Sequence, residues 1–222
     1  MLGEPDKRLL EFQQLCEELN VYLVIPFVEI GTRGDQPMGG TEFDDILQKN
    51  GVEPCLVEQD VYFNSAILMS PHVLDKSKPE PYCRWSHYRK RSPWPHPEVS
   101  WAEAGQLEPA VADTPYGRVG LAICFDIHTV LHHYKPHNID TLLYPIAWVD
   151  KNPLPVWFHG NLGKYVNSEI PNLNIVGANW SVDQHQSFYG YGCSSIYSAG
   201  NVLATTETFY GNEIIYADLD IK

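Results

Sequence analysis

The sequence of 222 residues contains no apolar run near the ~20 residues that a membrane-spanning helix requires. Its first residues have neither a basic start nor an apolar stretch, so the chain as given carries no signal peptide. Basic residues are few: 15 Lys and Arg face 28 Asp and Glu, for a formal net charge of −13. Nucleic acids and anionic membrane surfaces attract basic faces, so this balance argues against both as partners.

Zinc-binding cysteine spacing is also missing. None of the five cysteines forms a CxxC or a Cys/His finger pattern, which argues against a structural zinc site. An odd number of cysteines permits one working thiol and four others, either free or paired. They are Cys16, Cys55, Cys83, Cys124 and Cys193.

The length and the hydrophobic fraction of 44% predict one domain over residues 1–222. Apolar spacing predicts a helix and then three strands, over residues 7–20, 21–30, 61–69 and 84–90. Residues 31–40 and 92–110 are expected to be loops. The second half alternates strands and helices over residues 118–125, 128–134, 140–146, 154–169 and 173–179, and closes with strands over 192–198, 202–207 and 213–218. This order predicts an α/β layer architecture with a mixed sheet.

The strongest chemical signal is the segment TPYGRVGLAICFDI, residues 114–127. A turn leads into an apolar strand, and Cys124 stands where that strand gives way to a helix. A thiol there is exposed at the carboxyl end of a strand. The amides that begin the helix, starting at Phe125, favour a thiolate and can hold an oxyanion. The alternative is a buried, inert cysteine, because free cysteine is among the most buried residue types.

Several motifs in one order resemble the nitrilase (carbon–nitrogen hydrolase) superfamily, nearest its vanin and biotinidase branch. Residues 114–127 resemble the segment that holds the family's catalytic cysteine. Downstream segments resemble the strands that follow it, at residues 140–148 (DTLLYPIAW), 174–179 (NIVGAN) and 190–199. Upstream, residues 61–66 resemble a family strand, and residues 87–90 (HYRK) resemble the segment of the catalytic lysine. The likeness spans roughly residues 5–219.

The resemblance implies an α-β-β-α sandwich with Cys124 as the nucleophile. It gives Lys90 the role of stabilising the thiolate and the oxyanion and of helping to protonate the leaving amine. Glu98 follows Lys90 by about the distance at which the family places a supporting glutamate, although the Pro-rich spacing around it departs from the family's pattern. Without the resemblance, a solvated basic cluster around Lys90 and an exposed loop carboxylate at Glu98 are the alternatives.

The family's general base, a glutamate, lies on a segment before the helix predicted at residues 7–20, and the chain as given has no counterpart of it. The C-terminal domain of vanins and biotinidases has no counterpart either. Glu29 ends a predicted strand. In the family's register, however, this strand is the one that follows the strand carrying the base, so the base role is not transferred to Glu29. We therefore expect an N-terminally shortened sandwich. Its exposed strand edges favour a homo-oligomer, or association with a chain that supplies the missing segment.

Two functions are consistent with this reading. The first is hydrolysis of linear, non-peptide amides, pantetheine- or biocytin-like, through a cysteine thioester. That reaction needs a small-molecule amide and no metal or organic cofactor. The second is a non-catalytic binding or assembly module that has lost the general-base glutamate. The resemblance also implies a secreted protein, and the sequon Asn179-Trp180-Ser181 would fit a glycoprotein.

Histidines gather within residues 128–137. His128 and His132 have the i, i+4 spacing that metal sites use on helices, but no Glu follows His128, so the zinc-protease pattern fails. A papain-like pair of Cys124 with a histidine is a further alternative. A solvated helix face is the interpretation we favour.

Overall fold

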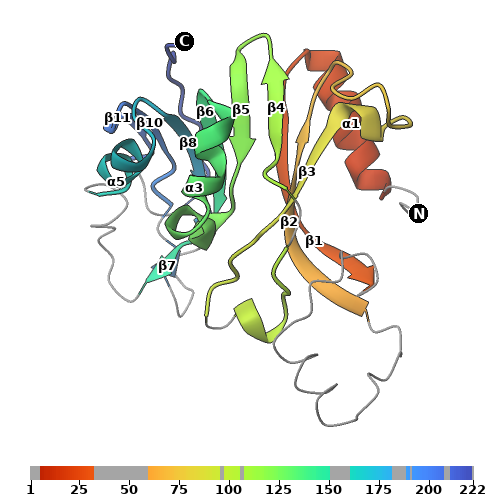
Figure 1. The fold of residues 1–222 in the computed structure, drawn as a ribbon, viewed down its shortest axis with the longest axis horizontal. Coiled ribbons are helices and arrows are strands. Elements are labelled where there is room, and N and C mark those ends of the chain that lie inside the picture. Colours follow the sequence, from red (N-terminus) through yellow and green to blue (C-terminus); the bar gives the residue numbers. More distant parts are fainter. Residues whose placement is uncertain are drawn as a thin grey trace.

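The computed structural model describes residues 6–32, 60–95, 98–105, 108–150, 161–181, 189–190, 192–207 and 211–221. Its strands form a three-stranded sheet and a six-stranded sheet, with helices outside them (Figure 1). Apolar residues of both sheets meet in one buried cluster, so the sheets pack face to face. This arrangement is the predicted α-β-β-α sandwich.

The first sheet has the order β1-β2-β3, with all pairs antiparallel. Helix α1 (Lys7–Leu19) precedes it, and its strands are β1 (Leu23–Thr32), β2 (Asp60–Met69) and β3 (Trp85–Arg89). Asp6 caps α1 by accepting a hydrogen bond from the Arg8 amide, and Asn20 ends the helix in a left-handed conformation. The predicted helix and the three predicted strands are confirmed. The loop was predicted over residues 31–40; its first two residues belong to β1, and the rest lie outside the described residues.

The second sheet has the order β11-β10-β8-β6-β5-β4. Strands β5, β6 and β8 are parallel and the outer pairs are antiparallel, which confirms the mixed sheet. The strands are β4 (Val111–Thr114), β5 (Gly117–Leu121), β6 (Thr141–Ile146), β8 (Asn174–Asn179), β10 (Ser195–Ser198) and β11 (Asn201–Thr205). Helices α3 (Leu131–Tyr134) and α5 (Leu162–Glu169) lie on its outer face, and β7 (Val149–Asp150) pairs with β9 (Tyr189–Gly190).

Three details differ from the sequence-based expectation. Residues 111–114, for which no strand was predicted, form β4, because the turn at residues 114–117 folds them back onto β5. The strand predicted over residues 118–125 ends at Leu121, and a 3-10 helix, Cys124–His128, follows. The strand predicted over residues 213–218 is wrong. Its alternating pattern leaves Ile214 and Tyr216 exposed, and it pairs with no strand of the described residues.

Four tyrosines are the largest fully buried side chains of the described residues: Tyr88, Tyr134, Tyr144 and Tyr197. Three of them donate their hydroxyl hydrogen to the turn that follows β5. Tyr88 donates to the Asp126 carboxylate at 2.9 Å, Tyr134 to the Leu121 carbonyl, and Tyr144 to the Cys124 carbonyl at 2.5 Å. A buried phenol needs such a partner, so these rings fix the turn as well as fill the core.

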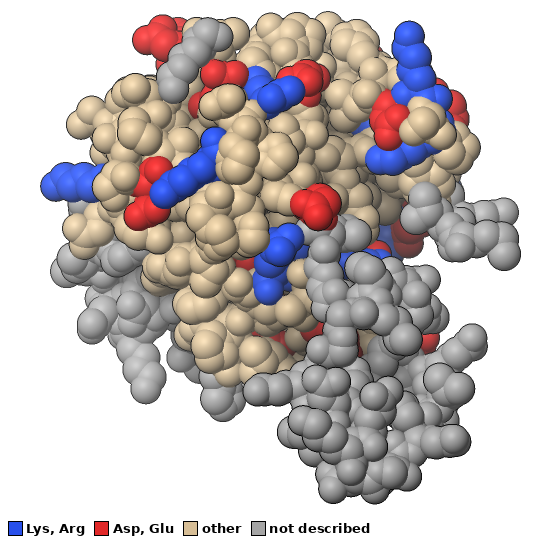
Figure 2. Space-filling model, viewed as in Figure 1, with Lys and Arg blue, Asp and Glu red and all other residues tan. Residues whose placement is uncertain are grey.

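Charges on the surface are mixed in sign. On the face shown in Figure 2, the described Lys and Arg side chains alternate with Asp and Glu side chains and do not gather into a basic patch. Within the described part of the chain, no helix is long and apolar enough to cross a membrane.

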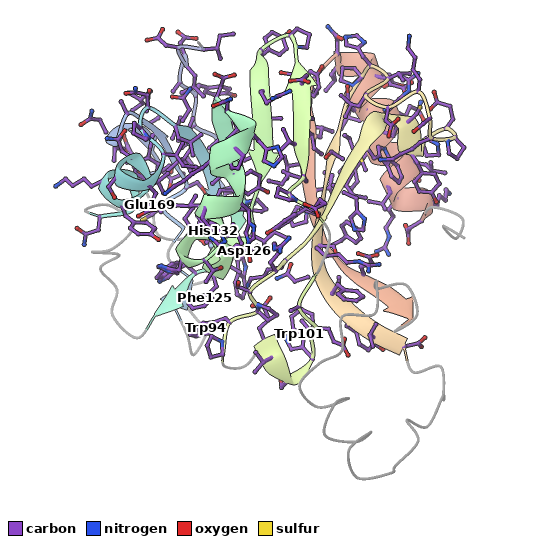
Figure 3. All side chains as sticks on the ribbon, viewed as in Figure 1. Trp94, Trp101, Phe125, Asp126, His132 and Glu169 are labelled. Carbon is purple, nitrogen blue, oxygen red and sulfur yellow. The ribbon has the colours of Figure 1, made fainter. Side chains whose placement is uncertain are left out.

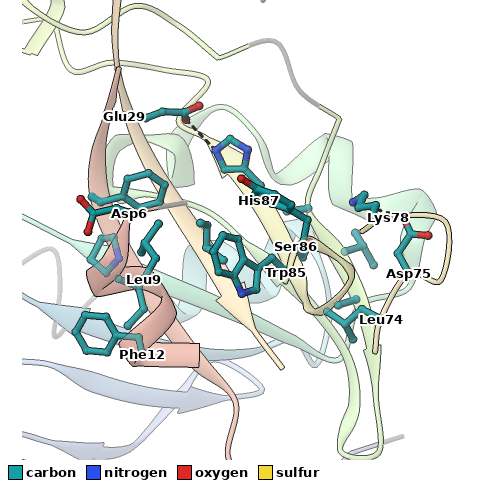
Figure 4. A pocket seen from close by; sticks show the side chains of 18 of the residues that line it. Asp6, Leu9, Phe12, Glu29, Leu74, Asp75, Lys78, Trp85, Ser86 and His87 are labelled. Atoms are coloured by element: carbon teal, nitrogen blue, oxygen red, sulfur yellow. Dashed lines mark hydrogen bonds and ion pairs between the residues drawn. The ribbon is translucent and has the colours of Figure 1, made fainter. Parts of the chain in front are cut away.

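Glu29 lies on the outer face of the three-stranded sheet, beside a surface depression lined by α1 and β3 (Figure 4). Its carboxylate bonds His87 at 2.8 Å, Arg89 at 2.6 Å and Ser65 at 2.6 Å. Side chains alternate along β3, so His87 and Arg89 point away from the inner face that Tyr88 occupies. Glu29 therefore faces away from the turn that carries Cys124.

Acid is expected to destabilise the chain through Glu29. Burial pushes its pKa up, but the bonds from His87, Arg89 and Ser65 outweigh burial and lower the pKa to about 2. Because the pKa of Glu29 is lower in the folded chain than in the unfolded chain, its ionised carboxylate stabilises the fold at pH values above the unfolded-state pKa. This contribution is lost as the pH falls toward 2. Its size is at most about 3 kcal/mol. Urea unfolding at pH 6 and pH 3 should show a loss that is smaller in Glu29→Gln. Equal losses in both proteins would contradict the assignment.

Candidate functional site

Cys124 occupies a sharp turn at the carboxyl end of β5. Its φ is +47°, in the left-handed region that non-glycine residues seldom adopt. Hydrogen bonding to its carbonyl by Tyr144 helps to hold this conformation. Such strain persists only where the surroundings impose it, and it is concentrated at functional sites. The side chain is half-buried and contacts both the inner core and the core beneath α3 and α5.

Burial dominates the electrostatics of the Cys124 thiol and raises its pKa. The Lys90 charge and the amides of Ala147 and Phe125 oppose that rise, whereas the Glu98 charge adds to it. The net direction is upward. The Phe125 amide does favour the thiolate, as expected, but the three favourable groups together do not offset the loss of water around the sulfur.

Lys90 directly follows β3 and is buried, with 2% of its surface exposed. Its amide donates to the Asn64 carbonyl at 2.8 Å, and its own carbonyl accepts from the Gly105 amide at 2.7 Å. Its ammonium Nζ is hydrogen-bonded to the carboxylate of Glu98. Lys90 is thus held by backbone and side chain alike, and the alternative of a solvated basic cluster is wrong for this residue.

Glu98 begins a 3-10 helix, Glu98–Ser100, and is buried, with 7% of its surface exposed. Besides Lys90, its carboxylate accepts from the Asn64 side-chain amide at 2.8 Å and from the Trp94 backbone amide at 2.7 Å. Three donors therefore hold it as the counter-ion of Lys90. The alternative of an exposed loop carboxylate is wrong.

Four site residues were predicted from the sequence: Cys124, Lys90, Glu98 and Phe125. In the structure, the charges of Lys90 and Glu98 and the Phe125 amide all influence the pKa of the Cys124 thiol. Phe125 and Asp126 of the turn are labelled in Figure 3, with Trp94 of the loop that leads to Glu98. Asn64, Ala147 and Asp126 were not among the residues predicted from the sequence. Ala147 lies within the Pro-x-Ala-Trp segment and Asp126 within Cys-Phe-Asp, so motif position was a usable signal for both. Asn64, in the middle of a strand, offers none.

The histidines of residues 128–137 form no metal site in the described structure. His128 is half-buried among aromatic rings, with ring centroids 5.2 Å from Phe125, 6.0 Å from Trp148 and 6.3 Å from Tyr165. Burial lowers its pKa. The favoured interpretation of a solvated helix face is therefore wrong for His128. Among the residues that the structure describes, no group of three His, Cys, Asp or Glu side chains could hold a metal ion.

The remaining described cysteines, Cys16, Cys83 and Cys193, are buried and unbridged. Burial raises the pKa of each. Cys55 lies outside the described residues. Of the four described cysteines, Cys124 is the one with a half-buried rather than a buried residue surface.

The sequon asparagine, Asn179, is the last residue of β8. Its side-chain carbonyl accepts from the Trp148 amide at 3.0 Å, and its side-chain nitrogen is buried. A glycan would be attached at that nitrogen. The folded chain therefore does not present the atom that N-glycosylation requires.

Comparisons with known proteins agree on one family. A family model described as "Carbon-nitrogen hydrolase" matches residues 4–222. The chain is 30% identical over 132 residues to Omega-amidase NIT2 from Bos taurus, covering 56% of this chain and 46% of that protein. It is 27% identical over 132 residues to Omega-amidase NIT2 from Homo sapiens, with the same coverage. The chain thus spans about half the length of these curated relatives.

Solved structures share the fold at lower identity. Nit3 from Saccharomyces cerevisiae, a member of branch 10 of the nitrilase superfamily, has a TM-score of 0.67 and 18% identity, covering 99% of this chain and 67% of that one. An amidase from Nesterenkonia sp. AN1, with acrylamide added at its active-site cysteine, has a TM-score of 0.62 and 15% identity, covering 89% and 63%. These relatives support the superfamily and do not support the narrower vanin and biotinidase resemblance.

Proposed function

The chain belongs to the carbon–nitrogen hydrolase family, and from this premise we propose that it hydrolyses linear, non-peptide amides through a thioester on Cys124. One observation carries the proposal. A buried lysine with its own counter-ion acts electrostatically on a half-buried cysteine whose backbone is held at positive φ. Burying an ion pair is expensive and adds little to stability, so its placement beside a thiol favours a chemical role.

The proposed reaction begins when the Cys124 sulfur loses its proton and attacks the amide carbon. A C–S bond forms and the carbonyl oxygen takes the negative charge. Lys90 and the amides of Phe125 and Ala147 are the donors available to that oxyanion. The C–N bond then breaks, and the nitrogen takes a proton and leaves as an amine or ammonia. Water attacks the thioester, the C–S bond breaks, and the acid departs as the thiol is reprotonated.

The first step needs a base, because burial raises the pKa of the Cys124 thiol. Glu98 is the carboxylate beside it, but three hydrogen bonds occupy Glu98 and it balances the Lys90 charge. We therefore assign the base to a carboxylate outside the described residues, supplied by another segment or by a partner chain. The family resemblance implies a glutamate in that role.

Two substrate classes follow from different arguments. The relatives named omega-amidase make omega-amides the first class. The motif resemblance to vanins and biotinidases makes pantetheine- and biocytin-like amides the second. Secretion, which rests on the same resemblance, stays a prediction, as does the single domain over residues 1–222.

A panel of amides tests the proposal. The folded chain is incubated with an omega-amide, pantetheine, biocytin and a capped peptide, and amine release is followed together with the intact mass after an acid quench. We expect an acyl adduct on Cys124 with at least one linear amide and none with the peptide. Cys124→Ala is the control that must lack the adduct.

The second candidate, a non-catalytic module, is favoured by one observation, the upward shift in the pKa of Cys124. A thiol that stays protonated and has no base cannot begin the reaction. If every amide of the panel leaves Cys124 unmodified while the chain remains folded, the module is the better description of this chain.

A further inference from the structure

Asp126 lies two residues after Cys124 and is fully buried. Its carboxylate accepts four hydrogen bonds, two at each oxygen: Tyr88 Oη at 2.9 Å and Ile123 N at 3.1 Å on Oδ2, and Ser92 N at 2.8 Å and Arg91 N at 3.1 Å on Oδ1. A carboxylate accepts at about four lone-pair sites and donates nothing, so the side chain is fully used.

These four donors come from two parts of the fold. Ile123 belongs to the turn that sets Cys124 at positive φ. The other three donors belong to the segment of β3 and the following loop that contains Lys90, on both sides of it. One carboxylate therefore joins the nucleophile's turn to the lysine's loop, across the interface between the two sheets.

We propose that Asp126 is a positioning residue that fixes Lys90 relative to Cys124. This inference rests on the proposed function, since the proposed chemistry requires Lys90 to stay close to the Cys124 sulfur. Asp126 acts through backbone amides and the Tyr88 hydroxyl and does not itself touch the reacting atoms. Asparagine at this position has one acceptor oxygen, so its NH₂ group would face an N–H donor of either the turn or the loop.

A charge effect on the thiol is the competing explanation, and it predicts the opposite sign. Burial raises the pKa of Asp126 to about 6, and hydrogen bonds from Ile123, Ser92 and Tyr88 oppose that rise, so the group is ionised at pH 8. Removing a nearby negative charge would make the Cys124 thiolate easier to form. Loosening Lys90 would make it harder to form, because Lys90 lowers the pKa of the thiol.

The test is the pH dependence of Cys124 alkylation by iodoacetamide, followed by peptide mass spectrometry in proteins shown to be folded. In Asp126→Asn we expect alkylation at pH 8 to be about threefold slower or more, with the rate profile moved to higher pH. Tyr88→Phe removes one donor and leaves the charge, so it should move the profile in the same direction by less. It also keeps the inference testable if Asp126→Asn does not fold.

A matched control is Asp140→Asn. Asp140 also accepts a backbone hydrogen bond, from the Arg118 amide at 2.8 Å, but it precedes β6 at the end of the sheet opposite Cys124. Asp140→Asn should lower the free energy of unfolding without moving the pH profile of Cys124 alkylation. In a background without the buried pair, Lys90→Gln with Glu98→Gln, the Asp126 substitution should add no further slowing.

The outcomes separate the two ideas. If Lys90→Gln, with Glu98 left in place, alkylates like the wild type, Lys90 does not influence the thiol, and the proposed function and this inference both fail. If that variant is slower but Asp126→Asn is unchanged or faster, only the positioning role is overturned.

Discussion

Replacing Lys90 with methionine is expected to destabilise the fold by about 3–5 kcal/mol, because a buried carboxylate then loses its counter-ion. Glu98 would keep its bonds from Asn64 and Trp94, but neither donor carries a charge. Amide turnover should disappear as well, since the oxyanion loses its only charged donor among the described residues around Cys124. Urea unfolding with amine release on the same preparations measures both effects.

The matched control removes both charges. Lys90→Met with Glu98→Leu eliminates the buried pair, and replacing such a pair by apolar groups is often neutral for stability. We expect the double variant to recover most of the lost stability and none of the turnover. Recovery of turnover would contradict the role of Lys90. A single variant as stable as the wild type would contradict the view that Glu98 is held as an anion.

Replacing Cys124 with alanine is expected to lower amide turnover by about 10⁶-fold, the order seen when a nucleophile is removed from an enzyme. Stability should change by no more than about 1 kcal/mol, because the side chain is small and half-buried. The initial rate of amine release, with the mass of the quenched protein, measures the first effect. Thermal unfolding measures the second.

Cys193→Ala is the matched control for that substitution. Cys193 is likewise a free cysteine at positive φ, 48° against 47° for Cys124, but it is buried and burial raises its pKa to about 11. The variant should retain turnover. Equal losses in the two variants would mean that strain relief or cysteine loss in general, rather than the Cys124 sulfur, accounts for the effect.

Local chemistry made much of the fold predictable. Apolar spacing identified α1, and β-branched runs identified β1, β2, β6 and β8 within a few residues. Strand β4 was missed, and a strand was wrongly predicted at residues 213–218, because a strand exists only where a neighbour supplies its hydrogen bonds, and alternation alone does not report the neighbour.

The site was predictable where a motif carried it and not where it depends on packing. Cys124 and Lys90 stood within recognisable segments, whereas the burial of Glu98 depends on its contacts with Asn64 of β2 and with Lys90, which the sequence does not show. The protonation of Cys124 was misjudged for the same reason. Sequence shows the amides that favour a thiolate, but it does not show how much water the surrounding core excludes.

The four buried tyrosines also set an alkaline limit. Burial raises the pKa of all four above the ordinary value, to about 12 for Tyr197. Below pH ~10 the phenols stay protonated in the folded and unfolded chain alike, and their contribution to stability is intact. Above that pH only the unfolded chain releases these protons, so each tyrosine favours unfolding by about 1.4 kcal/mol per pH unit. The buried tyrosines, three of which also hold the turn at Cys124, thus make the free energy of unfolding fall steeply in strong base.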